Sequence, residues 1–313
     1  MQKKIIALAV AGLVSGAAFA QSNVTVYGVM DVGVAKYKDV SLGATANGTA
    51  NDGTSRLGFK GSEDLGGGLK ANFNIEQAVN LANGATNATT FDRQAWMGLS
   101  GGFGELQIGR NYTAGFKTMA SYDATGMANY SAAVRRLNIG KAKDILAGDT
   151  VGGLRQDAQV LYISPNMGGL TVMFGHVLKG NSAAVPADSQ NEIGVTYVNG
   201  PIAAGLAWAD NGNGSKDKSL GGSFNFGMGR AVAGYYDMEG AQKGYSLGVA
   251  DIKAGPMLLG LEWAKDTGSA GKPKATVLNA KYPLSKRTFA YAVYSDFTEK
   301  AGDFWSLGVR HNF

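Results

Sequence analysis

One short stretch of the chain has the spacing of a serine-hydrolase nucleophile. Gly98, Ser100 and Gly102 fit the Gly-x-Ser-x-Gly pattern, in which the serine sits on a sharp turn from a strand into a helix. Here a second alternating strand follows instead of a helix, so a glycine-rich turn explains the pattern better. The two histidines, His176 and His311, look like strand residues, and neither makes a convincing general base. A hydrolase is therefore kept as an alternative function of this chain and is not the favoured one.

Two further motifs would bind ligands in another setting. Residues 66–71, Gly-Gly-Gly-Leu-Lys-Ala, fit a loose dinucleotide fingerprint, but period-two sequence follows where the fingerprint requires a helix. Residues 210–214 space oxygen ligands as a calcium loop does, but the twelfth position is Gly221 instead of the closing glutamate. The chain has no cysteine, which excludes disulfides and thiolate metal sites. We expect no metal and no cofactor.

The arginines are more informative than these motifs. Arg56 and Arg93 fall on the polar side of their predicted strands, and so does Arg155 if its strand covers residues 155–164. A charge on the lipid side of a membrane strand costs about 2–4 kcal/mol at the midplane, whereas a charge in a water-filled lumen stays solvated. Such lumen charges tune ion selectivity. The other interpretation is that each arginine is a solvated wall residue with no special effect.

The arginine side chains can face a water-filled lumen only if their strands have one apolar and one polar face. Residues 24–34 and 69–76 place apolar side chains at every second position, which is the period of a strand. Segments with this period follow one another along the chain, and counting them predicts about sixteen strands. Short connections rich in glycine or proline alternate with longer polar ones. This alternation is typical of an all-β, antiparallel up-and-down barrel with tight turns at one rim and long loops at the other.

Both ends of the chain favour a barrel in an outer membrane. Lys3 and Lys4, the apolar stretch 5–14 and the small-x-small site at 18–20 predict a cleavable export signal over residues 1–20, followed by a barrel over 21–313. The last ten residues alternate and end on Phe313, which we expect in the strand that closes the barrel. No later stretch reaches the apolar length of a membrane helix, so a membrane span must consist of strands.

A soluble sandwich of two sheets would show a similar alternation, because it also has one buried and one wet face. The even spacing of the segments and the aromatic residues near strand ends favour the barrel. The aromatic residues expected in a girdle at the membrane interfaces are Tyr197, Trp208, Tyr235, Tyr236, Trp263, Tyr282, Tyr291 and Trp305.

The formal charge of +5 is too small and too dispersed to predict nucleic-acid binding.

One connection is far longer than the others. Residues 111–153 contain no good strand, and loops longer than about fifteen residues are usually functional or disordered. Its aromatic and methionine content is too high for disorder. We therefore expect this loop to pack against the inner wall of a wide barrel.

Several segments carry a resemblance to a known family. Residues 55–71 read Ser-Arg-Leu-Gly-Phe-Lys-Gly-Ser-Glu-Asp-Leu-Gly-Gly-Gly-Leu-Lys-Ala, which resembles the second strand and first turn of Gram-negative general porins, most closely those of beta-proteobacteria. Residues 24–31, 93–99 and 308–313 resemble the first, fourth and last strands. The resemblance implies a sixteen-stranded homotrimeric barrel whose third extracellular loop folds inward to narrow each pore. It also implies that Arg56 and Arg93 belong to the family's basic cluster.

The predicted constriction has a basic wall that faces the long loop. The wall comprises Arg56, Arg93 and Arg155. The loop would contribute Asp123, Arg135 and Arg136. Other residues expected to face the lumen are Asp31, Lys60, Lys70 and Asp157. Because charge at the narrowest and least screened section sets ion preference, three arginines against one or two acids predict a modest preference for anions.

The sequence thus predicts a passive diffusion channel of a Gram-negative outer membrane for small hydrophilic solutes and ions, without catalysis. Its expected partners are outer-membrane lipid, small anions and two further copies of itself, with no nucleic acid. The resemblance places the small apolar faces of residues 24–34 and of Leu307, Val309 and Phe313 at a three-fold interface, where close packing holds subunits together in lipid. The alternatives are a barrel hydrolase and a structural or adhesive barrel, the latter with about eight strands and a filled lumen.

Overall fold

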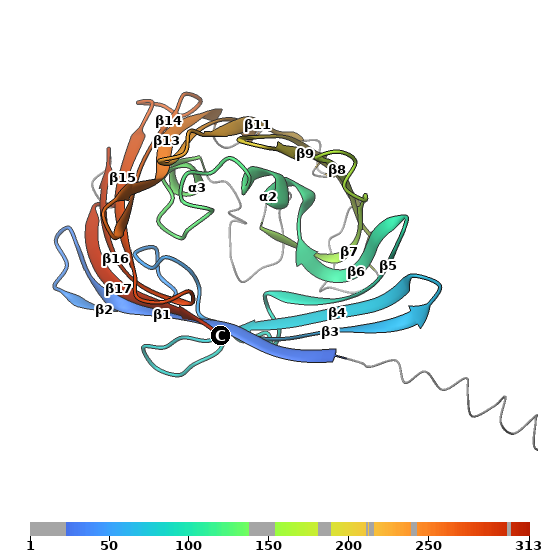
Figure 1. Cartoon of the computed structure of the whole chain (residues 1–313). Coiled ribbons are helices and arrows are strands. Elements are labelled where there is room, and N and C mark those ends of the chain that lie inside the picture. Colours follow the sequence, from blue (N-terminus) through green and yellow to red (C-terminus); the bar gives the residue numbers. More distant parts are fainter. Residues whose placement is uncertain are drawn as a thin grey trace, which may run out of the picture.

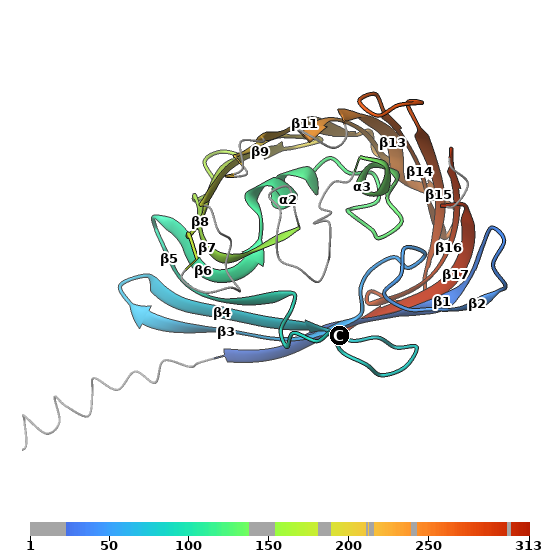
Figure 2. The ribbon, with the colours of Figure 1, turned by 180° about the vertical axis from the view of Figure 1, so that it is seen from behind.

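The computed structural model describes residues 23–137, 154–180, 189–210, 212, 216–238, 243–298 and 302–313, so the predicted export signal lies outside the described residues. Within these ranges the chain forms a closed antiparallel barrel (Figures 1 and 2). Sixteen strands make up its wall, and each pairs with the next along the chain. β1 (Asn23–Tyr37) pairs with both β3 (Arg56–Gly66) and β17 (Phe304–Asn312), which closes the ring. The prediction of a sixteen-stranded up-and-down barrel is confirmed.

The remaining strands follow in chain order. They are β4 (Leu69–Ala78), β5 (Gln94–Gly101), β6 (Gly104–Tyr112), β7 (Arg155–Ile163), β8 (Leu170–Val177), β9 (Gln190–Asn199), β10 (Ile202–Asp210), β11 (Lys216–Asn225), β12 (Arg230–Met238), β13 (Lys243–Ala254), β14 (Met257–Asp266), β15 (Lys274–Pro283) and β16 (Thr288–Phe297). A short strand, β2 (Gly43–Thr45), lies within the first long loop and pairs with β1.

The connections fall into two kinds, as the sequence predicts. The glycine-rich or proline-containing segments join β3 to β4, β5 to β6 and five further pairs, and together they form what we call the short-turn rim. Gly66, Gly67 and Gly68 all have positive φ, a conformation that side chains with a Cβ disfavour. The longer connections form the opposite, long-loop rim. In bacterial barrels the short turns face the periplasm and the long loops face outward.

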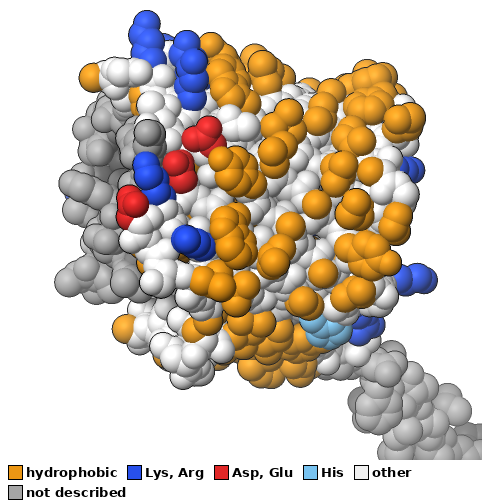
Figure 3. Space-filling view, turned by 90° about the vertical axis from the view of Figure 1, so that its left-hand side faces the viewer, with side chains coloured by type: hydrophobic (Ala, Val, Ile, Leu, Met, Phe, Trp, Pro, Cys, Tyr) orange, Lys and Arg blue, Asp and Glu red, His pale blue; other side chains and the backbone are white. Residues whose placement is uncertain are grey.

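The outer surface is apolar, as lipid contact requires (Figure 3). Along β1, Val24, Val26 and Val32 are exposed, whereas Val29 and Asp31 on the other face are buried. Hydrophobic side chains cover much of the face drawn in Figure 3, and charged ones lie mostly toward its edges.

The expected aromatic girdle is partly wrong. Tyr197, Tyr235 and Trp305 are exposed large side chains, as the prediction requires. Tyr236 and Tyr291 are instead buried. The Tyr291 hydroxyl bonds to Asp31 inside the barrel, and Tyr236 packs against a tyrosine of the long third loop. Their strand parity points them into the lumen, and the girdle argument overlooked that parity.

The described part of the long third loop lies inside the barrel (Figures 1 and 2). It carries two short helices, α2 (Ala114–Met119) and α3 (Ala132–Arg136). α2 contacts β8 to β11, and α3 contacts β13 to β15. The predicted inward fold is therefore present over residues 113–137, and residues 138–153 of the predicted loop lie outside the described ranges. In the described part of the chain, no helix is long and apolar enough to span a membrane.

The first long loop also folds inward, which the sequence analysis did not predict. Ala50, Asn51 and Asp52 are buried, although the sequence suggested an outer polar loop. The Asn51 amide donates to the Asp31 carboxylate at 3.1 Å, and the Gly53 backbone N–H donates to the same carboxylate at 2.7 Å. Two loops therefore occupy the lumen.

Candidate functional site

The three arginines of the predicted wall meet at the long-loop half of the barrel. Arg56 opens β3, Arg93 precedes β5 and Arg155 opens β7. Glu76 of β4 binds two of them, with Arg93 Nε 2.6 Å and Arg56 Nε 3.5 Å from its carboxylate oxygens. The Tyr112 hydroxyl at the end of β6 accepts from Arg155 Nη2 at 2.8 Å and from Arg93 Nη2 at 3.2 Å. One carboxylate and one phenol thus hold three guanidinium groups together.

This cluster keeps a net positive charge. Glu76 is only 3% exposed, and its carboxylate also accepts from the Tyr27 hydroxyl at 2.9 Å. The Arg155 guanidinium lies 4.3 Å from the centre of the Tyr112 ring, a cation–π contact. Three guanidinium cations therefore surround a single buried carboxylate in this cluster.

A cavity of about 260 Å³ lies against this wall on the side of the inward loops. Arg93 and Arg155 line it from the wall, and Arg135 of α3 lines it from the third loop. Arg110 of β6, which the sequence analysis did not select, is a fourth arginine of the lining. Its Nη1 lies 2.6 Å from the predicted lumen residue Asp157. The arginines thus converge on one space from both sides.

Arg136 and Asp123 differ in how far they reach the pore. Arg136 is half-buried at the end of α3. Asp123 is 1% exposed, and its carboxylate accepts from the Met127 backbone N–H at 2.7 Å and from Ser131 Oγ at 2.8 Å. It therefore caps turns inside the loop and does not present its charge to the pore. The sequence analysis selected Asp123 but did not predict these hydrogen bonds within the third loop.

The other predicted lumen residues keep their parity but differ in exposure. Lys60 is exposed, and its Nζ lies 5.1 Å from the centre of the Tyr27 ring. Lys70 is exposed and pairs in register with Asp64 near the short-turn rim. Asp31 is fully buried under the first long loop, so its carboxylate does not reach pore water.

A second charged cluster ties the first long loop to the wall and to the third loop. Lys281 Nζ and Arg310 Nη1 lie 2.6 Å and 2.5 Å from the Asp52 carboxylate, and the Tyr130 hydroxyl donates to it at 2.7 Å. Burial alone would raise the pKa of Asp52, but the two cations outweigh it and hold the pKa below its usual value. Asp52 lies in a polar loop whose sequence gives no sign of an inward position.

Two buried glutamates of the wall hold the helices of the third loop. Glu262 of β14 is 1% exposed and accepts from the Ala132 backbone N–H at 2.7 Å and from Ser131 Oγ at 3.3 Å, at the start of α3. Glu192 of β9 accepts from the Gly115 backbone N–H at 3.2 Å, at the start of α2. The first N–H groups of a helix lack intrahelical partners, so both glutamate side chains stabilise the inward loop by accepting hydrogen bonds from them.

The described residues contain no arrangement that would support hydrolysis. Ser100 lies at the end of β5, ahead of a tight turn, and its Oγ accepts from Asn72 at 2.8 Å. The two histidines bond elsewhere, to Asn191 and Thr288. Among the described residues, no group of three or more His, Cys, Asp or Glu side chains is placed to hold a metal ion.

Comparisons with known proteins point in one direction. A family model described as Gram-negative porin matches residues 7–302. The chain is 35% identical to outer membrane porin protein 32 of Delftia acidovorans over 317 residues, which cover 93% of this chain and 88% of the relative. The anion-selective porin from Comamonas acidovorans superposes with a TM-score of 0.74 at 27% identity, covering 94% of this chain and 100% of that one. The trimer form of OmpT of Vibrio cholerae shares the fold, with a TM-score of 0.66 at 16% identity over 93% of this chain and 99% of that one.

Proposed function

This chain belongs to the family of Gram-negative porins, and we propose that the arginines at its constriction give it a weak preference for anions. It is a passive diffusion channel of the outer membrane and not an enzyme. Its solutes are small hydrophilic molecules and ions that cross through the lumen.

The observation that carries the proposal is the convergence of arginines on one cavity. The residues that line that cavity from the wall and from the third loop are Arg93, Arg110, Arg135 and Arg155. Arg56 is outside the lining and contacts the Glu76 carboxylate, which also binds Arg93. Three acids stand against these five arginines: Glu76 and Asp157, which are bound to wall arginines, and Asp92 in the cavity lining. The acids therefore offset only part of the positive charge. A solved relative at 27% identity is described as anion-selective, which supports the same preference here.

The geometry also explains why the preference would be weak. Guanidinium groups replace part of the water around a passing anion with charge-assisted hydrogen bonds. A channel conducts only if such binding stays weak enough for the ion to leave. Because Glu76 and Tyr112 occupy several of the arginine N–H groups, the wall attracts an anion without enclosing it.

Processing and assembly complete the proposal. Residues 1–20 act as a cleaved export signal, and the mature barrel covers 21–313. Three copies associate through the apolar outer faces of β1 and β17, where the exposed Val32 and Val34 pair in register with the exposed Val309 and Leu307. Val24 and Val26 continue the exposed apolar face along β1. Small apolar side chains allow the close approach that holds membrane subunits together.

The test is a pair of substitutions in the wall. Arg56→Ser together with Arg93→Ser removes two cations, and a unit charge acting over about 4 Å contributes about 1 kcal/mol even in water. We expect the reversal potential in a KCl gradient to move toward cation preference, with a several-fold lower chloride-to-potassium permeability ratio. Arg287→Ser, at an exposed turn of the short-turn rim, is the matched control. An unshifted reversal potential in the double variant would mean that the wall does not set selectivity.

A further inference from the structure

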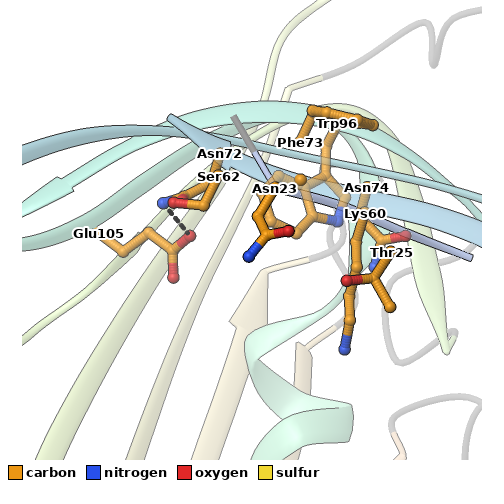
Figure 4. Close-up of a pocket in the computed structure, with 10 residues that line it drawn as sticks. Asn23, Thr25, Lys60, Ser62, Asn72, Phe73, Asn74, Trp96 and Glu105 are labelled. Carbon is orange, nitrogen blue, oxygen red and sulfur yellow. Dashed lines mark hydrogen bonds between the residues drawn. The ribbon is translucent and has the colours of Figure 1, made fainter. Parts of the chain in front are cut away.

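The inner wall carries a second cavity (Figure 4). Lys60, Ser62 and Asn72 of its lining lie nearer than Arg56 to the turn between β3 and β4, so this cavity is closer to the short-turn rim than the arginine wall is. Its volume of about 460 Å³ is in the range of small-molecule sites. Lys60 in its lining is four residues along β3 from Arg56, which separates the two sites by about 13 Å. Neither the family match nor the proposed selectivity assigns a role to this second cavity.

Strand register brings the lining together. Residues paired directly across antiparallel strands project from the same face of the sheet. One row of such partners crosses β1, β3, β4 and β5 and consists of Thr25, Lys60, Asn74 and Trp96. The adjacent row consists of Asn23, Ser62 and Asn72. Both rows share the parity of the inward residue Asp31, so they face the lumen.

The chemistry of the lining differs from that of the arginine wall. Three amides line it: those of Asn23 and Asn74 can both donate and accept, whereas Asn72 donates within the lining and offers its carbonyl oxygen. The one lysine, Lys60, is matched by one carboxylate, Glu105, so the formal charges cancel. An inorganic anion needs donors only and a metal cation needs acceptors only. A mixture of both suits hydroxyl groups, which donate and accept at once.

The side chains are held in place before any solute arrives. Asn72 Nδ2 donates to Ser100 Oγ at 2.8 Å and to Glu105 Oε1 at 3.4 Å, the contact drawn in Figure 4. Asn74 Oδ1 accepts from the Tyr27 hydroxyl at 2.8 Å. These contacts lower the entropy cost of ordering the site on binding.

Trp96 adds a flat apolar surface to this polar lining. Its indole Nε1 donates to Gln94 at 3.1 Å, which fixes the orientation of the ring. Ring-shaped polyols present apolar C–H faces between their hydroxyl groups, and such faces pack well on an aromatic ring.

We propose that this cavity is a binding site for neutral, ring-shaped polyhydroxylated solutes, that is, small sugars, which would enrich them in the lumen on the short-turn side of the constriction. The proposal rests on the channel function, because solutes reach the cavity through the lumen. It predicts that one barrel serves two classes of solute, anions at the arginine wall and neutral sugars at this second cavity.

The experiment uses the mature protein in planar bilayers, with KCl conductance measured before any sugar is added. Sucrose is then added to each side in turn, and the excess current noise gives the apparent dissociation constant of the sugar. Poly(ethylene glycol) of the same hydrodynamic size controls for pore blocking by bulk alone. We expect noise with sucrose that exceeds the noise with the polymer.

Substitutions locate the site. Trp96→Ala is expected to raise the apparent dissociation constant by about tenfold, equivalent to about 1.4 kcal/mol. Asn23→Ala, at the exposed start of β1, should weaken binding with little risk to the fold. Trp96→Phe keeps an aromatic ring but loses the Nε1 bond, and should fall between wild type and alanine. Asn225→Ala, at the last residue of β11, should leave binding near wild type.

The outcomes separate the two proposals. Normal KCl conductance with sucrose noise no greater than that of the polymer would overturn the sugar site and leave the channel standing. Sucrose binding that persists unchanged in both Trp96→Ala and Asn23→Ala would also overturn it. A reconstituted barrel without KCl conductance would contradict the channel function, and the sugar site with it.

Discussion

At the scale of single residues, Glu76 decides how the arginine wall is arranged. It is the buried acid of the cluster, and it holds Arg56 and Arg93 while accepting a hydrogen bond from Tyr27. A carboxylate in this position both orients the guanidinium groups and reduces their charge. These two effects act in opposite directions on anion preference, and a charge-neutral substitution separates them.

Glu76→Gln keeps an oxygen that accepts from Arg93 and removes the negative charge. We expect a higher chloride-to-potassium permeability ratio, by about twofold to fivefold, because one charge a few ångströms away contributes about 1 kcal/mol. Reversal potentials measured in a KCl gradient check this, with Glu63→Gln on an exposed part of β3 as the control. A shift of the reversal potential toward potassium preference would mean that the guanidinium groups move out of position without the negative charge of Glu76.

The sequence predicted part of this site, and the limits have a physical reason. Arg56 and Arg93 were found from strand parity and from a family resemblance, both of which depend on local pattern. Tyr112 lies in the 111–153 segment, whose aromatic content was considered only as a whole, and Arg110 was not selected. Their roles come from contacts between strands far apart in the chain, such as the bond from Arg155 to Tyr112. Asp123 is the opposite case, because the sequence pattern selected it but its carboxylate accepts hydrogen bonds within its own loop.

At the scale of elements, the pore depends on how two loops are fixed to the wall. Strand periodicity predicted the wall because alternation is a local property. It also predicted that the third loop packs inside, from the apolar content of that loop. It did not predict the inward fold of the first loop, because residues 46–55 are polar and two of the partners of Asp52, Lys281 and Arg310, lie on strands near the other end of the chain.

Glu262 is the clearest test of how the third loop is held. Glu262→Ala leaves the Ala132 and Ala133 backbone N–H groups without their acceptor, and each buried unbonded group costs about 1–3 kcal/mol. We expect an assembled barrel whose single-channel current is noisier and more variable in open conductance than wild type. Single-channel recordings measure this.

The controls for this prediction are two further substitutions. Glu262→Gln retains an acceptor oxygen and should fall between wild type and alanine. Asp296→Ala, at an exposed end of β16, should behave like wild type. Quiet wild-type recordings from Glu262→Ala would show that the rest of the loop packing fixes α3 without the glutamate.

At the scale of the whole molecule, the family resemblance places the apolar outer surface of β1 and β17 at a three-fold interface, and we therefore expect a homotrimer. Val24, Val26, Leu307 and Val309 are exposed and apolar, and the barrel is closed at this seam by the mutual backbone bonds of Gly28 and Phe313. A Cβ on Gly28 would lie 2.4 Å from the Phe313 ring, so the two residues fit only with glycine there. Native mass spectrometry in several mild detergents should give three copies per particle. A single-barrel mass in all of them would contradict the prediction.

The central claim is that this porin is a water-filled channel whose narrowest section favours anions. The most direct test is the reversal potential of the wild-type channel in a planar bilayer between unequal KCl concentrations. The arginines that line the cavity at the proposed constriction predict a reversal potential with the sign of chloride preference and a magnitude well below that of an ideally selective membrane. A reversal potential with the sign of potassium preference would contradict the account.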